Sequence, residues 1–132
     1  MRTLLDTHIV LRWFAQHDGL SQRQRRIINS ADAGDPLLIS DISLWEVATL
    51  HELGRIRLRR PLRDWLEQLA ALAQVERTGI SPAIAAEVAT LPPTFHRDPA
   101  DRIIVASARV HGARLLTRDN RIIASRLIPT VS

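Results

Sequence analysis

The chain has 132 residues, a net charge of +4 and 45 % hydrophobic residues, which suits one ordinary domain with an apolar core. It contains no Cys and no Lys, which excludes disulfides, thiolate metal sites, Schiff-base chemistry and lysine-dependent phosphate loops. No apolar run is long enough to cross a membrane, and the N-terminal residues do not resemble a secretion signal. We therefore expect a cytoplasmic protein in which residues 1–132 form a single domain.

Short apolar segments typical of strands alternate with segments of helical periodicity. In chain order, the sequence predicts a strand at 2–5, helices at 7–16 and 21–33, a strand at 36–40, helices at 41–53 and 61–73, a strand at 75–80, helices at 82–91 and 98–110, a strand at 113–117, a helical turn at 120–125 and a strand at 127–131. Ser21 is expected to cap the second helix and Gly34 to end it, while Gly54 and Gly112 end later helices. Pro61 is expected in the first turn of its helix.

This alternation predicts an α/β fold, in which helices cover both faces of a mostly parallel sheet of four to five strands. The result is a three-layer α/β/α sandwich. Ligands of such sheets bind at the carboxyl ends of the strands. Polar residues that directly follow a strand are therefore the first candidates for a functional site.

Two acids follow predicted strands in this way. Asp6 comes directly after the first strand, and Asp119 comes two residues after the strand at 113–117. Each also precedes a possible helix, where Asp is a favoured N-cap, so capping is an alternative role for both. Both carboxylates are expected at the same edge of the sheet.

Glu46 lies in the middle of a helix, on a mostly apolar face that includes Ile42 and Leu50. It is too far along the helix to act as a cap. A buried carboxylate is normally paired or bound to a metal, because leaving it alone is costly. The alternatives are a salt bridge to a buried Arg and a helix phase that exposes Glu46.

The heptapeptide HRDPADR at 96–102 contains two more acids. Asp98 followed by Pro99 fits the start of a helix, with Asp98 as the N-cap. Asp101 lies one turn inside that helix, which is apolar nearly all round and therefore buried against the sheet. We expect Asp101 to face the edge of the core.

Four carboxylates in one crevice require a compensating charge. Mg²⁺ or Mn²⁺ would supply it, because hard divalent cations prefer oxygen ligands. Such a site activates water and stabilises displacement at phosphorus. The set comprises Asp6, Glu46, Asp101 and Asp119.

Four motifs in this order resemble those of PIN-domain proteins, and most of all the VapC-type toxins of bacterial type II toxin–antitoxin modules. They are LLDTH at 4–8, SLWEVA at 43–48, DPADRIIVASA at 98–108 and LLTRD at 115–119. The resemblance implies a metal-dependent endoribonuclease that hydrolyses RNA phosphodiester bonds. It also implies a homodimer that a cognate antitoxin neutralises.

Carried over residue by residue, the resemblance places Asp6, Glu46 and Asp101 on the three main acids of the family's site. Asp119 falls on the fourth, more variable acid. It also implies supporting roles for Thr117, which matches a small hydroxyl residue before that acid, and for Arg102.

The run RIRLRRPLR at 55–63 is strongly basic. Its Arg55, Arg57, Arg59 and Arg60 are expected either to contact RNA or the antitoxin, or to form a solvated turn. Two other readings of the whole chain remain open. One is a catalytically inactive PIN-fold module that acts only through its partner. The other is a haloacid-dehalogenase-type phosphatase, which His8 and the absence of Lys disfavour.

Overall fold

The computed structural model describes residues 1–132 as five strands and seven helices. Their bounds in chain order are β1 (Thr3–Leu5), α1 (Thr7–Phe14), α2 (Gln22–Ser30), β2 (Leu37–Ser40), α3 (Asp41–Glu52), α4 (Leu62–Ala71), β3 (Val75–Thr78), α5 (Pro82–Thr90), α6 (Pro99–His111), β4 (Arg114–Leu116), α7 (Asn120–Ser125) and β5 (Thr130–Val131). The predicted elements are confirmed in type and order. None of the helices has both the length and the apolar character needed to cross a membrane.

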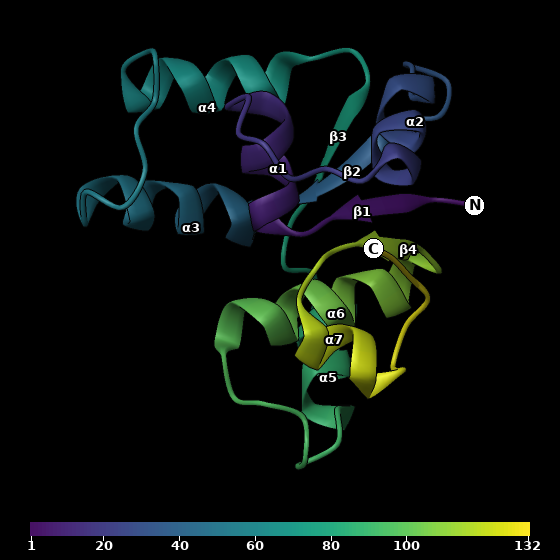
Figure 1. The fold of residues 1–132 in the computed structure, drawn as a ribbon. Coiled ribbons are helices and arrows are strands. Elements are labelled where there is room, and N and C mark those ends of the chain that lie inside the picture. The colour runs from purple at the N-terminus through teal and green to yellow at the C-terminus, as the bar shows by residue number, and fades with distance from the viewer.

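The strands form one sheet in the order β3-β2-β1-β4-β5, and every pair is parallel. Helices α1 to α4 lie on one side of this sheet, and α5, α6 and α7 lie on the other (Figure 1). The three-layer α/β/α prediction is therefore confirmed. Since all strands run the same way, their carboxyl ends meet at one edge, with β1 at the centre.

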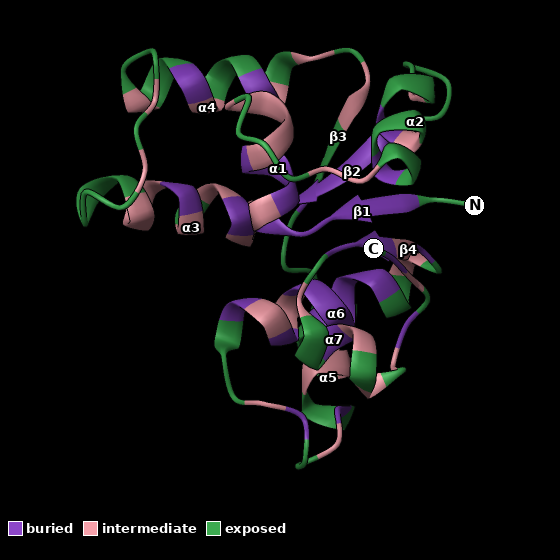
Figure 2. Ribbon diagram, viewed as in Figure 1, coloured by how far each residue is buried: buried purple, intermediate pink, exposed green.

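Successive side chains of each strand enter different cores. Leu5 and Leu116 pack with α1 to α4, whereas Leu4 and Leu115 pack with α6, α7 and the segment that follows α5. This is the alternation that a strand imposes, and full burial of each leucine contributes about 1.5–3 kcal/mol. Figure 2 shows that the central strands and the inner face of α6 are buried, while α2, α4 and α5 turn exposed faces outward. The sheet edge is thus held from both sides.

Local capping sets most helix ends. Ser21 forms a reciprocal capping box with Gln24 at the start of α2, and Gly112 ends α6 with a φ of 60°. The prediction that Gly34 ends α2 is wrong. The helix stops at Ser30, because Asp32 Oδ1 accepts the backbone N–H groups of the two residues after Ala33 and closes a tight turn.

Two other boundaries differ from the prediction. Pro61 is the cap residue before α4 and not part of its first turn. The last strand is reduced to Thr130–Val131, because only these two residues pair with β4.

Candidate active site

Asp6 lies at the end of β1, and its side chain is only 4 % exposed. Its Oδ1 accepts the backbone N–H of Thr7 at 2.8 Å, so it does cap α1. Its Oδ2 accepts the hydroxyl of Thr117 at 2.7 Å. The carboxylate is therefore fixed by two neighbouring strand ends, which capping alone does not require.

Glu46 reaches the same edge from α3. The hydroxyl of Thr7 donates to its Oε1 and lies 2.8 Å from the hydroxyl of Ser43. Glu46 is half-buried and forms no ion pair with an Arg, so both alternatives considered for it are wrong. Burial raises the pKa of Glu46, the bond from Thr7 opposes this, and the charges of Asp6 and Asp98 add to it.

Asp101 lies in the first turn of α6, which Asp98 caps by accepting the N–H groups of Ala100 and Asp101. Burial is the main cause that raises the pKa of Asp101 to about 7. The charges that add to this effect are those of Asp6, Asp98, Asp119 and Glu46. The start of α6 thus lies at the strand edge, as assumed from the sequence, and Asp98 adds to the field there as well as capping.

Asp119 caps α7 through Oδ1, which accepts the N–H groups of Arg121 and Ile122. Its Oδ2 lies 3.6 Å from the guanidinium of Arg121, which is too exposed for a strong ion pair. The backbone N–H of Asp119 donates to the hydroxyl of Thr117. Thr117 therefore joins the two acids that follow strands, because the same hydroxyl donates to Asp6.

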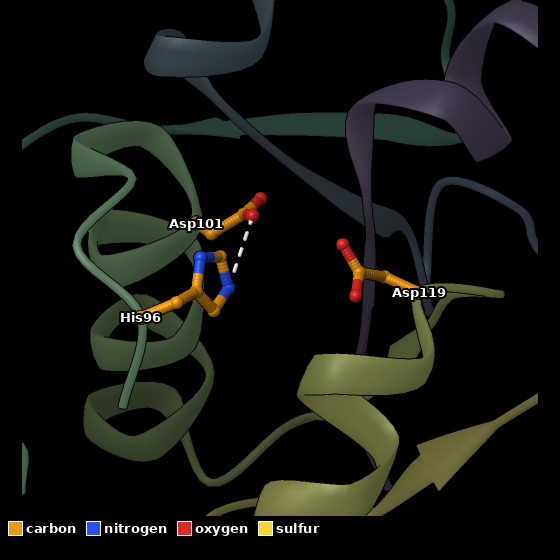
Figure 3. Close-up of side chains that lie close together, drawn as sticks. All are labelled: His96, Asp101 and Asp119. Carbon is orange, nitrogen blue, oxygen red and sulfur yellow. Dashed lines mark ion pairs between the residues drawn. The ribbon is translucent and has the colours of Figure 1, made fainter. Parts of the chain in front are cut away.

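His96 is a neighbour of this cluster that sequence reasoning missed. Its Nε2 lies 3.3 Å from Asp101 Oδ2, and ligand atoms of His96, Asp101 and Asp119 all lie within 4.8 Å of one another. Figure 3 shows the imidazole beside Asp101 and the carboxylate of Asp119 facing both of them from the start of α7. Its position five residues before Asp101, at the head of HRDPADR, is the only local signal for it.

His8 also contacts the carboxylate of Asp6. Its Nε2 accepts the backbone N–H of Arg118 at 3.0 Å, so its proton resides on Nδ1, which lies 3.4 Å from Asp6 Oδ2. Burial lowers the pKa of His8. The charges of Asp6 and Asp119 oppose this effect, and those of Arg12 and Arg118 add to it. The imidazole of His8 therefore lies between the backbone of Arg118 and the carboxylate of Asp6.

Arg102 points away from the acids. It is buried, its guanidinium donates to the backbone carbonyls of Phe95 and His96, and it lies 5.9 Å from the centre of the Phe95 ring. Its contribution is to hold the loop that carries His96.

The basic run lies outside the acidic cluster, in the connection between α3 and α4. Its four candidate residues are all exposed: Arg55, Arg57, Arg59 and Arg60. The last three line a cavity of about 380 Å³ with Trp13, Phe14 and Trp65.

The donor set fits a divalent cation. Four carboxylates lie near enough to raise the pKa of Asp101, and Arg121 is the only Arg within ion-pair range of any of them. The buried Nε2 of His96 has no hydrogen-bond partner. A cation would both neutralise these acids and satisfy that nitrogen.

A parallel five-stranded sheet whose carboxyl edge carries a cluster of acids is typical of α/β domains that can bind a divalent cation at that edge. The PIN domain model matches residues 3–126, and the chain belongs to the PIN domain family. It is 42 % identical over 123 residues to Ribonuclease VapC22 of Mycobacterium tuberculosis (strain ATCC 25618 / H37Rv), covering 93 % of this chain and 91 % of that protein.

Solved structures share the fold at low identity. VapBC2 from Rickettsia felis, bound to a DNA fragment from their promoter, matches with a TM-score of 0.71 and 15 % identity over 99 % of this chain and 98 % of that one. A toxin–antitoxin complex from Klebsiella pneumoniae matches with a TM-score of 0.66 and 20 % identity over 98 % and 96 % of the two chains. These likenesses identify the architecture.

Proposed function

We propose that this protein is the endoribonuclease toxin of a type II toxin–antitoxin module. In this proposal it hydrolyses RNA phosphodiester bonds with Mg²⁺ or Mn²⁺, acts in the cytoplasm where its RNA is found, and uses residues 1–132 as one PIN domain. The observation that carries the proposal is the meeting of Asp6, Glu46, Asp101 and Asp119 at one sheet edge, in a chain 42 % identical to a ribonuclease. An inactive module would have no use for four costly carboxylates in one place.

The four acids would hold the cation, and each has an oxygen able to accept another bond. When bound, the cation would polarise a water for attack and neutralise charge that develops on the phosphate. Thr117 and His8 hold Asp6 in place, and Thr7 holds Glu46. These bonds preorganise the ligands, so that little rearrangement is needed when RNA binds.

Cleavage of a fluorescent RNA in Mg²⁺ or Mn²⁺, with and without EDTA, tests this function. We expect Asp6→Asn and Asp101→Asn to abolish cleavage while circular dichroism stays native, because each removes charge and keeps bulk. Asp64→Asn, which changes an exposed acid of α4, is the matched control and should cleave normally. Wild-type rates in the Asp101→Asn protein, or metal-independent cleavage, would contradict the proposal.

For the antitoxin, we propose the cavity bordered by Arg57, Arg59 and Arg60. Its aromatic lining of Trp13 and Trp65, together with a basic rim, suits a peptide with apolar and acidic side chains better than it suits RNA.

The double variant Arg59→Ala/Arg60→Ala tests this assignment against the RNA alternative. We expect weaker antitoxin binding by calorimetry and unchanged RNA affinity across a salt series. The control is Arg23→Ala/Arg26→Ala on the exposed face of α2. If RNA affinity falls and antitoxin affinity does not, the run is an RNA contact instead.

The proposed homodimer would use α3. Trp45 is 60 % exposed on this helix, and Leu53 at its end is 59 % exposed, which is unusual for residues of this size. Trp45→Lys should therefore shift the protein to a monomer in light scattering. Ile80→Lys, at another exposed apolar position, is the control. A dimer that survives Trp45→Lys would exclude this surface.

A further inference from the structure

The starting observation is the environment of the His96 ring. Its Nε2 is buried without a hydrogen-bond partner, although Asp101 Oδ2 lies only 3.3 Å away. Buried polar atoms are nearly always satisfied in proteins. The contact with Asp101 Oδ2 does not meet the geometry of a hydrogen bond, so the nitrogen remains available to a ligand. A cation bound between His96 Nε2 and the Asp101 carboxylate would satisfy both groups.

The ring is held where it is by the rest of the fold. Arg102 binds the carbonyl of His96 itself and that of Phe95, and the Phe95 and His96 rings are 4.6 Å apart. Asp98 fixes the start of α6, which carries Asp101. The side chains of His96 and Asp101 are only 16 % and 13 % exposed. The backbone that carries the imidazole is therefore fixed, and the ring itself contacts Phe95 and Asp101.

Three different segments bring donors together at this point: the loop before α6, α6 itself and the start of α7 (Figure 3). His96 is the one nitrogen donor among them, whereas Asp6 and Glu46 on the other side of the cluster offer oxygen alone. Imidazole is a good ligand for first-row transition metals, and Mg²⁺ strongly prefers oxygen. A ligand set that includes His96 should therefore bind a transition metal ion such as Mn²⁺ more tightly than Mg²⁺.

We propose that His96 is a ligand of the metal centre, beside Asp101 and Asp119, and that it makes the centre select Mn²⁺ over Mg²⁺. This inference rests on the proposed function, because it concerns the cation that the nuclease would use. His96 is in this view a determinant of metal selectivity in addition to the acids.

Calorimetric titration of the metal-free protein with Mn²⁺ and, separately, with Mg²⁺ tests the inference. We expect His96→Gln to weaken Mn²⁺ binding by at least about tenfold while Mg²⁺ binding changes little, so that the ratio of the two affinities falls. His51→Gln, at an exposed position of α3, is the matched control and should keep the wild-type ratio. An unchanged ratio in His96→Gln, or an equal loss for both ions, would overturn the inference.

A second measurement uses the wild-type protein and does not depend on the variant folding. In pulsed electron paramagnetic resonance spectra of substoichiometric Mn²⁺ bound to the protein, we expect the ¹⁴N coupling of a directly bound imidazole. Bound Mn²⁺ that shows no nitrogen coupling would overturn the inference.

Different results would contradict the proposed nuclease function and the proposed role of His96. If Asp101→Asn abolishes metal binding and cleavage while His96→Gln retains the Mn²⁺ preference, the function stands and the role of His96 falls. If the wild-type protein binds neither ion, the proposed function falls with it.

Discussion

At the scale of single residues, the clearest feature is the raised pKa of the Asp101 carboxyl group. Burial and four neighbouring carboxylates raise its pKa from an ordinary 3.8 to about 7. A carboxyl group with a raised pKa binds protons more tightly in the folded chain than in the unfolded one. Between the two pKa values, the folded state therefore loses stability as the pH rises.

Without metal, we accordingly expect the melting temperature to fall as the pH is raised from about 5 to about 8, because Asp101 ionises among like charges. Thermal melts in EDTA across this range measure the slope. Asp101→Asn should flatten it and melt higher than the wild type at the upper end. Asp64→Asn should retain the wild-type slope, and a steep slope in Asp101→Asn would assign the effect to another group.

The hydroxyl oxygen of Thr117 takes part in two hydrogen bonds of the acidic cluster. Its hydroxyl donates to Asp6 and accepts from the N–H of Asp119. Thr117→Val keeps the shape but leaves both partners unsatisfied, so we expect a loss of about 1–3 kcal/mol in urea unfolding and slower RNA cleavage. Thr117→Ser keeps the hydroxyl and should remain near wild type in both measurements. Equal behaviour of Val and Ser would remove the hydroxyl from the account.

At the scale of elements, Asp98 both caps α6 and contributes negative charge to the acidic cluster. Asp98 accepts two N–H groups at the start of the helix, and its charge also raises the pKa values of Asp101 and Glu46. Capping and electrostatics can be separated, because Asn caps a helix about as well as Asp.

We expect Asp98→Ala to lower the unfolding free energy by about 1 kcal/mol through the lost cap. Asp98→Asn should keep the cap and stabilise the metal-free protein at neutral pH by relieving repulsion. Urea unfolding in EDTA at about pH 7 compares the three proteins. Equal destabilisation by Ala and Asn would mean that the charge of Asp98 itself holds the helix.

Local signals were sufficient to predict these elements, because caps and periodicity act over a few residues. The reach of Asp32 into the turn after α2 was not anticipated, and Gly34 was therefore assigned the wrong role. Neighbouring helices also had to be packed before the partner of Glu46 was known. That partner, Thr7, is 39 residues away, whereas the sequence argument considered a metal ion, a buried Arg or exposure.

At the scale of the whole molecule, the parallel order of the strands brings the acids together. The alternation of strands and helices predicted that the strands are mostly parallel, though not their order in the sheet, and the acids that follow strands were found on that basis. His96 escaped because its place depends on a loop folded back by Arg102 onto Phe95, a contact that no periodicity encodes. The direction of a loop is decided by burial, which only the assembled chain reveals.

A metal that binds only the folded chain should stabilise the whole molecule. At a concentration 100 times its Kd, the expected gain is about 2.7 kcal/mol, measurable as a rise in melting temperature on adding Mn²⁺ or Mg²⁺. EDTA should reverse the rise, and Asp6→Asn should reduce it sharply, whereas Asp64→Asn should not. A rise of equal size in Asp6→Asn would place the ion elsewhere.

The pairing of β1 with β4 has a consequence for the time at which activity begins. Asp6 obtains its hydroxyl partner only from Thr117, 111 positions later, and Asp119 follows still later. During synthesis, the first acids emerge from the ribosome long before the last strands that complete the cluster. Because its parts lie more than a hundred residues apart in the sequence, the acidic cluster can be completed only after β4 and Asp119 have left the ribosome.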